Sequence, residues 1–201
     1  MYGLAVAGEA TARALLDRGA TVIAVDDSID DERTARADGL GVELVVTPDD
    51  EHLERLVAAC DLVVPAPGVP EHHRLFAIAA SAGRRVVSEL ELAYDWEQQR
   101  PGGPRPMLTV TGTDGKTTTT LLAVEMLTAG GLRSVAAGNT DVPLVTAVGD
   151  DSLDVFVVEC TSFRLAWTER FRGDAAAWLN LAPDHLNWHR SLDSYIAEHA
   201  A

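Results

Sequence analysis

The stretch Val110–Thr118, which reads VTGTDGKTT, decides how the second half of this chain folds. An apolar strand end runs into a short loop bounded by glycines, and a lysine followed by threonines opens a helix. Lys116 is the only lysine among the 16 lysines and arginines of the 201 residues. The amides of such a loop and of the helix N-terminus bind phosphate, and the lysine ammonium adds a mobile positive charge. We therefore predict a nucleotide-phosphate site with Thr117 as a ligand of Mg²⁺, formed by Gly112, Thr113, Asp114, Gly115, Lys116, Thr117 and Thr118.

The loop is shorter than the common phosphate-binding pattern G-x-x-x-x-G-K-[ST], which would place a glycine where this chain has Val110. The alternative interpretation is a glycine turn before a helix that happens to carry a lysine. The phosphate site is favoured because the motif requires a strand before the loop and a helix after it, and both are predicted here.

Composition argues against several classes of partner. The net charge of −15 and the isoelectric point near 4.6 leave no basic surface for nucleic acid or an anionic membrane. No apolar stretch approaches the roughly 18 residues of a membrane-spanning helix, and no signal peptide is visible. Cys60 and Cys160 lie far apart without metal-ligand spacing, so we expect reduced thiols in a cytoplasmic protein.

A segment rich in proline and glycine, residues 101–106, divides the chain in two, because it can continue neither a helix nor a central strand. Helices and strands alternate on both sides, which predicts an α/β fold with parallel sheets. We expect a Rossmann-like domain over 1–100, a linker over 101–106 and a phosphate-binding domain over 107–201. Predicted helices are 9–18, 32–38, 48–59, 72–82, 89–98, 116–129 and 192–201, and predicted strands are 21–25, 42–46, 62–65, 85–87, 107–111, 134–137, 154–158 and 175–181.

Both ends suggest a fragment. A glycine-rich turn at 3–8 normally follows a first strand, and here little or no strand precedes it. At the other end, the last predicted helix runs into Ala200 and Ala201 without a cap. We expect the first strand to be missing and the second domain to be truncated.

Two candidate metal ligands follow predicted strands. Glu159 comes directly after the apolar run 155–158, at the strand end where α/β sheets bind ligands, and a carboxylate there suits Mg²⁺. The alternative role for Glu159 is to cap the next helix. His185 follows another strand and can contact metal or phosphate, although a histidine on a loop is commonly just solvated. A zinc pair with His189 is disfavoured because Pro183 makes this segment a turn.

Other positions are weaker candidates. Gly3 and Gly8 with Asp26 eighteen residues later resemble a dinucleotide-type turn whose acidic residue contacts a ribose or base, but a purely structural turn fits equally well. Asn139 follows a strand and can turn toward a ligand. The turn Pro67–Pro70 is either rigid packing or part of a site.

Taken in order, these motifs resemble the Mur ligase family, and within it the branch that adds D-glutamate. The resemblance covers nearly the whole chain. The matching stretches are GLAVAG (3–8), AVDD (24–27), PAPGVP (65–70), SELEL (88–92), TVTGTDGKTTTT (109–120), AGNTDVPL (137–144), VVECTSF (157–163) and NLAPDHLNWH (180–189).

The resemblance implies an enzyme of peptidoglycan precursor synthesis, a monomer at full length, whose C-terminal amino-acid-binding domain lies outside this chain. With ATP and Mg²⁺ it would phosphorylate the carboxylate of UDP-N-acetylmuramoyl-L-alanine and then join D-glutamate to it. The implied catalytic residues are Lys116, Glu159 and His185, with Thr117, Glu159 and His185 serving the metal. The implied substrate contacts are Val6, Ala7, Asp26, Asp27, Asn139, Thr161 and Ser162.

The chain departs from the family pattern at several positions. Asp114 replaces an asparagine and adds negative charge beside the phosphates, and Thr161–Arg164 replaces Ser-Ser-Phe-Gln. Ser28 stands where some relatives place an arginine. The family uses a carbamylated lysine four residues after the tyrosine that corresponds to Tyr195, and here that position is His199.

Three other functions remain open on the sequence. The first is a folylpolyglutamate or other Mur-type ligase, and binding of a uridine nucleotide to the first domain would separate it from the main hypothesis. A nicotinamide-dependent oxidoreductase would explain the N-terminal glycine turn but not Lys116, Glu159 and His185, and an NADH titration tests it. A non-catalytic nucleotide-binding module is the third.

Overall fold

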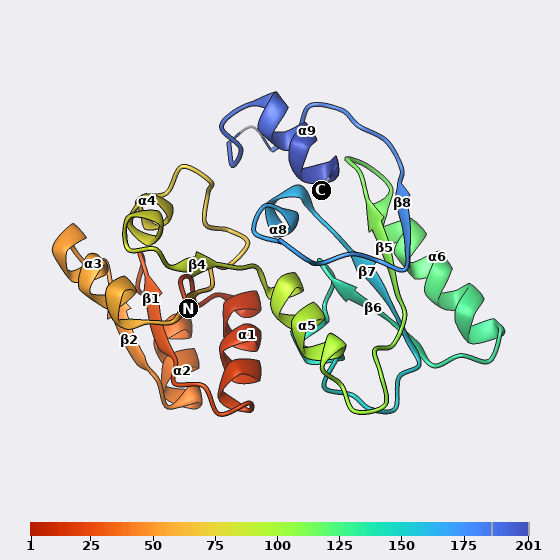
Figure 1. The fold of residues 1–201 in the computed structure, drawn as a ribbon, viewed down its shortest axis with the longest axis horizontal. Coiled ribbons are helices and arrows are strands. Elements are labelled where there is room, and N and C mark those ends of the chain that lie inside the picture. Colours follow the sequence, from red (N-terminus) through yellow and green to blue (C-terminus); the bar gives the residue numbers. More distant parts are fainter. Residues whose placement is uncertain (186, 201) are drawn as a thin grey trace. The chain divides into compact units, whose positions relative to one another are not determined.

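The computed structural model describes residues 1–185 and 187–200, and it divides into two compact units, Met1–Ser88 and Glu89–Ala201 (Figure 1). The predicted α/β fold with parallel strands is confirmed in both units. Ala201, the last residue of the final predicted helix, lies outside the described residues. Within the described ranges, no helix is both long and apolar enough to cross a bilayer.

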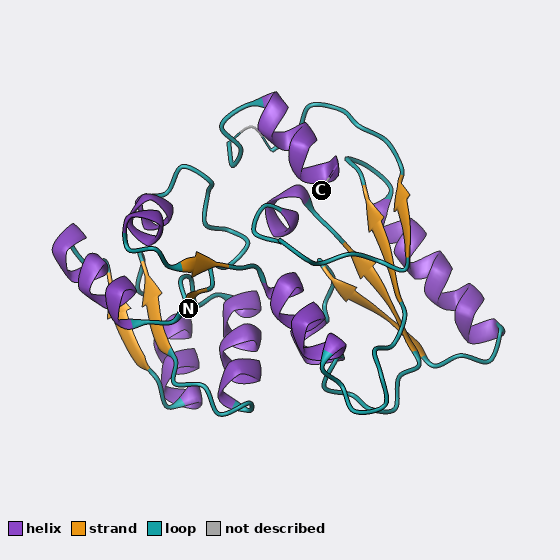
Figure 2. Cartoon of the chain, in the orientation of Figure 1, coloured by secondary structure: helices purple, strands orange, loops and turns teal. Residues whose placement is uncertain are grey.

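The first unit alternates helices and strands as the sequence predicts (Figure 2). Aspartates begin two of its helices, because the side chains of Asp30 and Asp49 accept hydrogen bonds from the first-turn amides of Arg33 and His52. β1 pairs with β2 and β3 with β4, both in parallel. The elements are α1 (Val6–Leu16), β1 (Ile23–Asp26), α2 (Asp31–Leu40), β2 (Glu43–Val46), α3 (Asp50–Ala59), β3 (Leu62–Val63), α4 (Arg74–Ser81) and β4 (Arg85–Val86).

The first three residues lie between these two strand pairs. Tyr2 bridges in parallel to both Val25 and Pro65. Its amide donates to the carbonyl of Val64 at 2.9 Å, and the amide of Gly3 donates to that of Val25 at 2.7 Å. Although we predicted little or no strand before the glycine turn, this short segment occupies a central strand position between β1 and β3.

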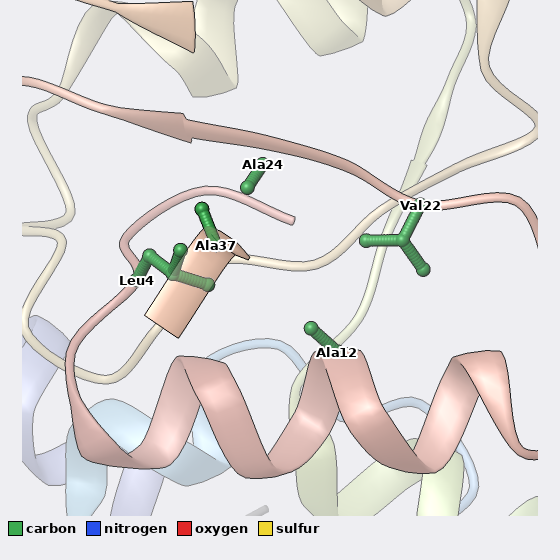
Figure 3. Close-up of a cluster of buried hydrophobic side chains, with 5 residues drawn as sticks. All are labelled: Leu4, Ala12, Val22, Ala24 and Ala37. Carbon is green, nitrogen blue, oxygen red and sulfur yellow. The ribbon is translucent and has the colours of Figure 1, made fainter. Parts of the chain in front are cut away.

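The core of the first unit packs helices α1 and α2 against β1. Figure 3 shows its buried cluster, which comprises Leu4, Ala12, Val22, Ala24 and Ala37. Helix α1 crosses the turn at Gly3 so closely that a Cβ on Gly8 would lie 1.9 Å from the carbonyl oxygen of Gly3. Only glycine fits there, which explains the second glycine of the N-terminal motif.

The second unit holds a four-stranded parallel sheet in the order β6-β7-β5-β8. Every residue of β7 is buried, and α6 packs on β5, β6 and β7. Leu121, Leu122 and Met126 on α6 are exposed. The elements are α5 (Glu89–Gln98), β5 (Met107–Thr111), α6 (Lys116–Ala129), β6 (Ser134–Gly138), α7 (Leu144–Ala147), β7 (Val155–Glu159), α8 (Ser162–Leu165), β8 (Ala175–Trp178) and α9 (Leu192–Ala200).

Helix α5 belongs to this second unit, so the units divide before it and not at the predicted linker 101–106. Three buried carboxylates of α5 hold it there. Glu97 pairs with Arg105 at 2.8 Å, and Glu89 pairs with Arg164 at 2.7 Å. Glu91 accepts hydrogen bonds from three consecutive backbone amides, at residues 169–171. Burial raises the pKa of the Glu89 carboxyl, although the neighbouring Arg164 opposes this shift. The motif SELEL contains Glu89 and Glu91, so its role in this structure is to attach α5 to the second unit.

Candidate functional site

The loop between β5 and α6 has a backbone that requires its two glycines. Gly112 has φ of +135°, and a Cβ on it would lie 3.0 Å from the carbonyl oxygen of Asn180. Gly115 has φ of +83° and is the N-cap of α6. Because this N-cap residue is glycine, it offers no side chain to accept from the first amides of the helix, which point out of the helix end. This is the geometry in which a helix N-terminus binds an anion.

Asn180, which follows β8, holds the loop in shape. Its side-chain oxygen accepts from the amide of Asp114 at 2.9 Å, and its side-chain amide donates to the carbonyl of Asp114 at 2.9 Å. Its backbone carbonyl accepts from the amide of Thr113. The loop is thus fixed against the neighbouring strand of the sheet, and it needs little rearrangement to bind a ligand.

The ammonium group of Lys116 folds back over the loop. Its Nζ donates to the carbonyl oxygens of Gly112 at 2.7 Å and Thr113 at 2.9 Å. The positive charge of the lysine therefore lies beside Gly112 and Thr113 of the loop, close to the N-terminus of α6. The hydroxyl-bearing Thr117 and Thr118 that follow it are exposed, as is Asp114.

Glu159 ends the neighbouring strand β7 at the same edge of the sheet. Register places it level with Val110 on β5 and Gly138 on β6, so the parallel topology brings it to the edge where the loop between β5 and α6 begins. Its side chain is buried, with 1% of the residue exposed. Gly138 has φ of +90°, and a Cβ there would lie 2.5 Å from the carbonyl oxygen of Glu159.

The two carboxylate oxygens of Glu159 differ. Oε1 accepts from the side-chain amide of Asn139 at 2.8 Å. Oε2 is buried and has no hydrogen-bond partner among the described residues, and the same is true of the hydroxyl of Thr161 two residues later. A buried carboxylate oxygen without a partner is costly unless a ligand satisfies it. Hard oxygen donors of this kind fit Mg²⁺.

His185 lies on the loop after β8 with φ of +53°, a left-handed conformation that is uncommon for a residue other than glycine. Its ring packs edge-on against Phe163, four residues beyond Glu159, with 5.5 Å between ring centroids. Its side chain is about two-fifths exposed, at 42%. Within the described ranges, no three histidine, cysteine or acidic side chains cluster closely enough to hold a metal by themselves. A cation here would need hydroxyl, phosphate or water oxygens as well.

Several residues near the loop were not predicted as functional. Tyr195 on α9 is buried, and its hydroxyl lies 2.8 Å from the hydroxyl of Thr113 in the loop. Ser162, which was predicted as a substrate contact, is buried, and its Oγ lies 2.7 Å from Nε2 of His189, a buried residue that was not predicted as functional. No local pattern marks these pairs, because each joins residues at least 27 positions apart. The side chain of His199, at the position of the expected lysine, lies outside the described part of the chain.

In the first unit, both carboxylate oxygens of Asp26 accept hydrogen bonds from the protein itself. It accepts from the backbone amides of Leu4 at 2.7 Å and Ser28 at 3.0 Å, and from Arg33 at 3.0 Å. Burial opposes ionisation of this carboxyl, but these hydrogen bonds and the nearby guanidinium hold its pKa below the usual value. Asp26 thus shapes the turn that it was predicted to use for ligand binding.

Asp27 is partly exposed and joins two residues that the sequence did not single out. Its carboxylate accepts from the hydroxyl of Tyr2 at 2.7 Å and lies 3.0 Å from Nε2 of His73. Val6 is the first residue of α1 and is strongly exposed, and Ala7 follows it. The structure places these residues beside the C-terminal end of β1, where α/β sheets bind ligands.

Comparison with known proteins identifies relatives of both units. Residues 110–201 match the Mur ligase middle domain family. The chain is 43% identical over 198 residues to a protein of Streptomyces avermitilis and 44% identical over 204 residues to one of Frankia casuarinae. Both are named UDP-N-acetylmuramoylalanine–D-glutamate ligase. These alignments include 98% and 100% of this chain but 41% of each relative, so the chain spans about two-fifths of their length.

Solved structures support the fold. One is the UDP-N-acetylmuramate:L-alanyl-gamma-D-glutamyl-meso-diaminopimelate ligase from Neisseria meningitides, with a TM-score of 0.59, 18% identity, and coverage of 98% of this chain and 64% of that one. Another is a murein peptide ligase from Psychrobacter arcticus, with a TM-score of 0.53, 20% identity, and coverage of 98% and 45%. At these identities the likeness concerns the fold alone.

Proposed function

Since residues 110–201 of this chain match the Mur ligase middle domain family, we propose that the whole protein is the ATP-dependent ligase that joins D-glutamate to UDP-N-acetylmuramoyl-L-alanine. The names of relatives about 40% identical over the chain support this substrate pair. In this reaction the γ-phosphoryl group of ATP moves to the alanyl carboxylate and ADP leaves. The amine of D-glutamate then attacks the carbonyl carbon, and phosphate and a proton leave as the amide forms. We place this enzyme in the cytoplasm as a monomer.

We assign ATP binding to the loop 112–118. Backbone amides of the loop and of the first turn of α6 would hold the phosphates, with the ammonium of Lys116 over the transferring group. That ammonium already bonds the carbonyls of Gly112 and Thr113, so it would exchange a carbonyl for a phosphate oxygen without leaving the loop. Its role is electrostatic, because negative charge must be balanced on the group that is transferred.

We assign Mg²⁺ to Glu159, with the hydroxyl of Thr117 and the imidazole of His185 as further contacts. The observation that carries this assignment is the buried Oε2 of Glu159, which has no partner among the described residues. When bound there, the metal would neutralise charge on the phosphates. Asn139 holds the other oxygen of Glu159, so we propose that it positions this carboxylate in addition to its predicted contact with substrate.

We assign residues of each unit, taken separately, to contacts with the acceptor substrate. Thr161 and Ser162 would face the alanyl carboxylate, and the buried hydroxyl of Thr161, which has no partner among the described residues, is available for it. Val6 and Ala7 at the start of α1, with Asp26 and Asp27, would contact the uridine end. Because Asp26 already accepts four hydrogen bonds, from Leu4, Ser28 and Arg33, its contribution would be to hold the turn, whereas Asp27 keeps an exposed carboxylate for a ligand.

A chimera tests the proposed function. This chain would be joined to the remaining C-terminal part of the Streptomyces avermitilis relative, and ADP release would be measured with ATP, Mg²⁺, UDP-N-acetylmuramoyl-L-alanine and D-glutamate. We expect release that requires both substrates, at a rate near the ~1–10³ s⁻¹ of ordinary enzymes. The 201 residues alone should show no turnover, because they lack the amine-binding domain that the resemblance implies.

The control for the chimera is the same protein carrying Lys116→Arg. A soluble, folded chimera that is inactive with this substrate pair but active with another amine or acceptor would refute the proposed specificity. Turnover that is unchanged in the Lys116→Arg control would refute the proposed ATP site.

A further inference from the structure

The hydroxyl of Thr113 joins the loop between β5 and α6 to two distant segments of the chain. It lies 2.8 Å from the hydroxyl of Tyr195 on α9. It also accepts from the backbone amide of Ala182 at 2.9 Å and lies 3.0 Å from the carbonyl oxygen of the same residue. A hydroxyl donates one hydrogen bond and accepts two, so these three contacts use its whole hydrogen-bonding capacity. The protein itself therefore saturates the side chain of Thr113.

The backbone of Thr113 leads directly to the lysine. Its carbonyl oxygen accepts from Nζ of Lys116 at 2.9 Å. Its amide donates to the carbonyl of Asn180 at 3.3 Å, which is long for a bond of this kind. The contacts of the Thr113 hydroxyl are shorter than this amide bond, so they help to fix the carbonyl oxygen on which the ammonium of Lys116 rests.

Tyr195 is a rigid partner for the loop. Only 1% of the residue is exposed. Its ring packs edge-on against the imidazole of His189, with 5.3 Å between ring centroids. Nε2 of His189 lies in turn 2.7 Å from Oγ of Ser162, the first residue of α8. A buried ring that is packed in this way has little freedom to turn, so its hydroxyl keeps a fixed position.

We propose that Tyr195 is a positioning residue for the nucleotide, which acts through Thr113 by fixing the loop between β5 and α6 in the conformation that binds phosphates. This inference rests on the proposed ATP site. Tyr195 lies 82 positions from Thr113 in the sequence, and in this role it does not contact the nucleotide. A loop that is already ordered loses less conformational entropy when a ligand binds. Loss of the Tyr195 hydroxyl therefore weakens ATP binding although every group that contacts ATP is retained.

The variant Tyr195→Phe removes the hydroxyl and keeps the ring. Calorimetric titration of the 201-residue chain with ATP and Mg²⁺ should show binding weakened about five- to tenfold. In the chimera, KM for ATP should rise by a similar factor, whereas KM for D-glutamate should stay within about twofold. The matched control is Val155→Ala, which leaves a small cavity at the opposite end of β7 and destabilises the fold without altering the loop. Its affinity for ATP should stay within about twofold of the original.

A double-mutant cycle with Thr113→Val tests whether Tyr195 acts through Thr113. By itself Thr113→Val should weaken ATP binding at least as much as Tyr195→Phe, and adding the second substitution should weaken it by less than about twofold more. Hydrogen exchange gives a readout without ligand. The amides of Thr113 and Asp114, which donate to Asn180, should exchange at least about fivefold faster in Tyr195→Phe than in Val155→Ala.

Three results would overturn the proposal. They are unchanged ATP affinity in Tyr195→Phe, equal exchange of the loop amides in Tyr195→Phe and the control, and a further loss of about fivefold when Tyr195→Phe is added to Thr113→Val. If Tyr195→Phe does not fold, unchanged ATP affinity in Thr113→Val overturns it instead. An unmodified chain that binds no ATP would refute the proposed ATP site together with this inference, which distinguishes the two failures.

Discussion

Replacing Glu159 with glutamine should separate metal binding from folding. The variant Glu159→Gln keeps the shape of the side chain and an oxygen for the amide of Asn139, but it removes the negative charge that we assign to Mg²⁺. The hydrogen bond from Asn139, at 2.8 Å, changes from charge-assisted to neutral, which loses about 1 kcal/mol. An amide group at the position of Oε2, which has no hydrogen-bond partner among the described residues, costs about 1–3 kcal/mol if it too stays unpaired.

A gain offsets these losses. The buried carboxylate carries a desolvation penalty of several kcal/mol, and the substitution removes it. The terms are similar in size and opposite in sign, so we expect the free energy of unfolding to change by less than about 2 kcal/mol in the absence of metal. The affinity for ATP should behave differently, because the Mg²⁺-dependent part of binding depends on the missing charge.

Calorimetric titration of ATP with and without Mg²⁺ measures the Mg²⁺-dependent part of the affinity for ATP. We expect Mg²⁺ to tighten ATP binding to the unmodified chain by tenfold or more, about 1.4 kcal/mol, and to have no effect on the variant. The matched control is Glu125→Gln, which removes one charge from the exposed surface of α6 and should leave the effect of Mg²⁺ unchanged. A variant that folds and still gains tenfold from Mg²⁺ would show that Glu159 does not hold the metal.

The other predictions concern separate features of the two units. Lys116→Arg in the active chimera should reduce kcat/KM more than tenfold, at a cost of over about 2 kcal/mol, because a planar guanidinium does not reproduce the contact of the ammonium with phosphate; circular dichroism checks the fold, and activity above about a tenth of the original would argue against the assignment. Gly138→Ala should lower the free energy of unfolding by more than about 2 kcal/mol in urea titration, since its Cβ would lie 2.5 Å from a carbonyl oxygen at positive φ; an unchanged midpoint would contradict this. Asp26 has a lowered pKa in the folded chain, so its stabilising effect is present above the unfolded value near 3.8 and disappears as the pH falls through the folded pKa; Tm measured from pH 6 to pH 3 should drop more steeply in the original than in Asp26→Asn. Burial raises the pKa of the Cys160 thiol, so iodoacetamide at pH 8 should modify Cys60 first and Cys160 only on unfolding, as peptide mass spectrometry will show.

The candidate site combines residues that are held in place by hydrogen bonds with buried polar groups that lack a hydrogen-bond partner among the described residues. Asn180 and Tyr195 form hydrogen bonds with the loop between β5 and α6, and Asn139 donates a hydrogen bond to one oxygen of Glu159. The second oxygen of Glu159 and the hydroxyl of Thr161 are buried without partners among the described residues. Such unmet polar groups cost stability, and a site that binds charged ligands is where that cost is offset.

The sequence by itself predicted the glycine loop between β5 and α6, the alternation of helices and strands, and the sheet edge that Glu159 occupies. The loop is a local feature, since two glycines and Lys116 act within a few residues of one another. Glu159 reaches the same edge because parallel strands that run in one direction share their carboxyl ends, whichever order they take in the sheet. Local pattern and topology therefore decide the location of the site.

Only the tertiary structure decided which groups meet there. A helical pattern at 89–98 does not reveal that buried Glu89 and Glu91 bind it to the second unit, and nothing near Met1 in the sequence shows that Tyr2 lies between two strands. The pairing of Glu159 with Asn139 joins residues 20 positions apart. Such contacts depend on strand register and on the packing of distant segments, so no local sequence pattern encodes them, whereas loop geometry and strand direction are local properties.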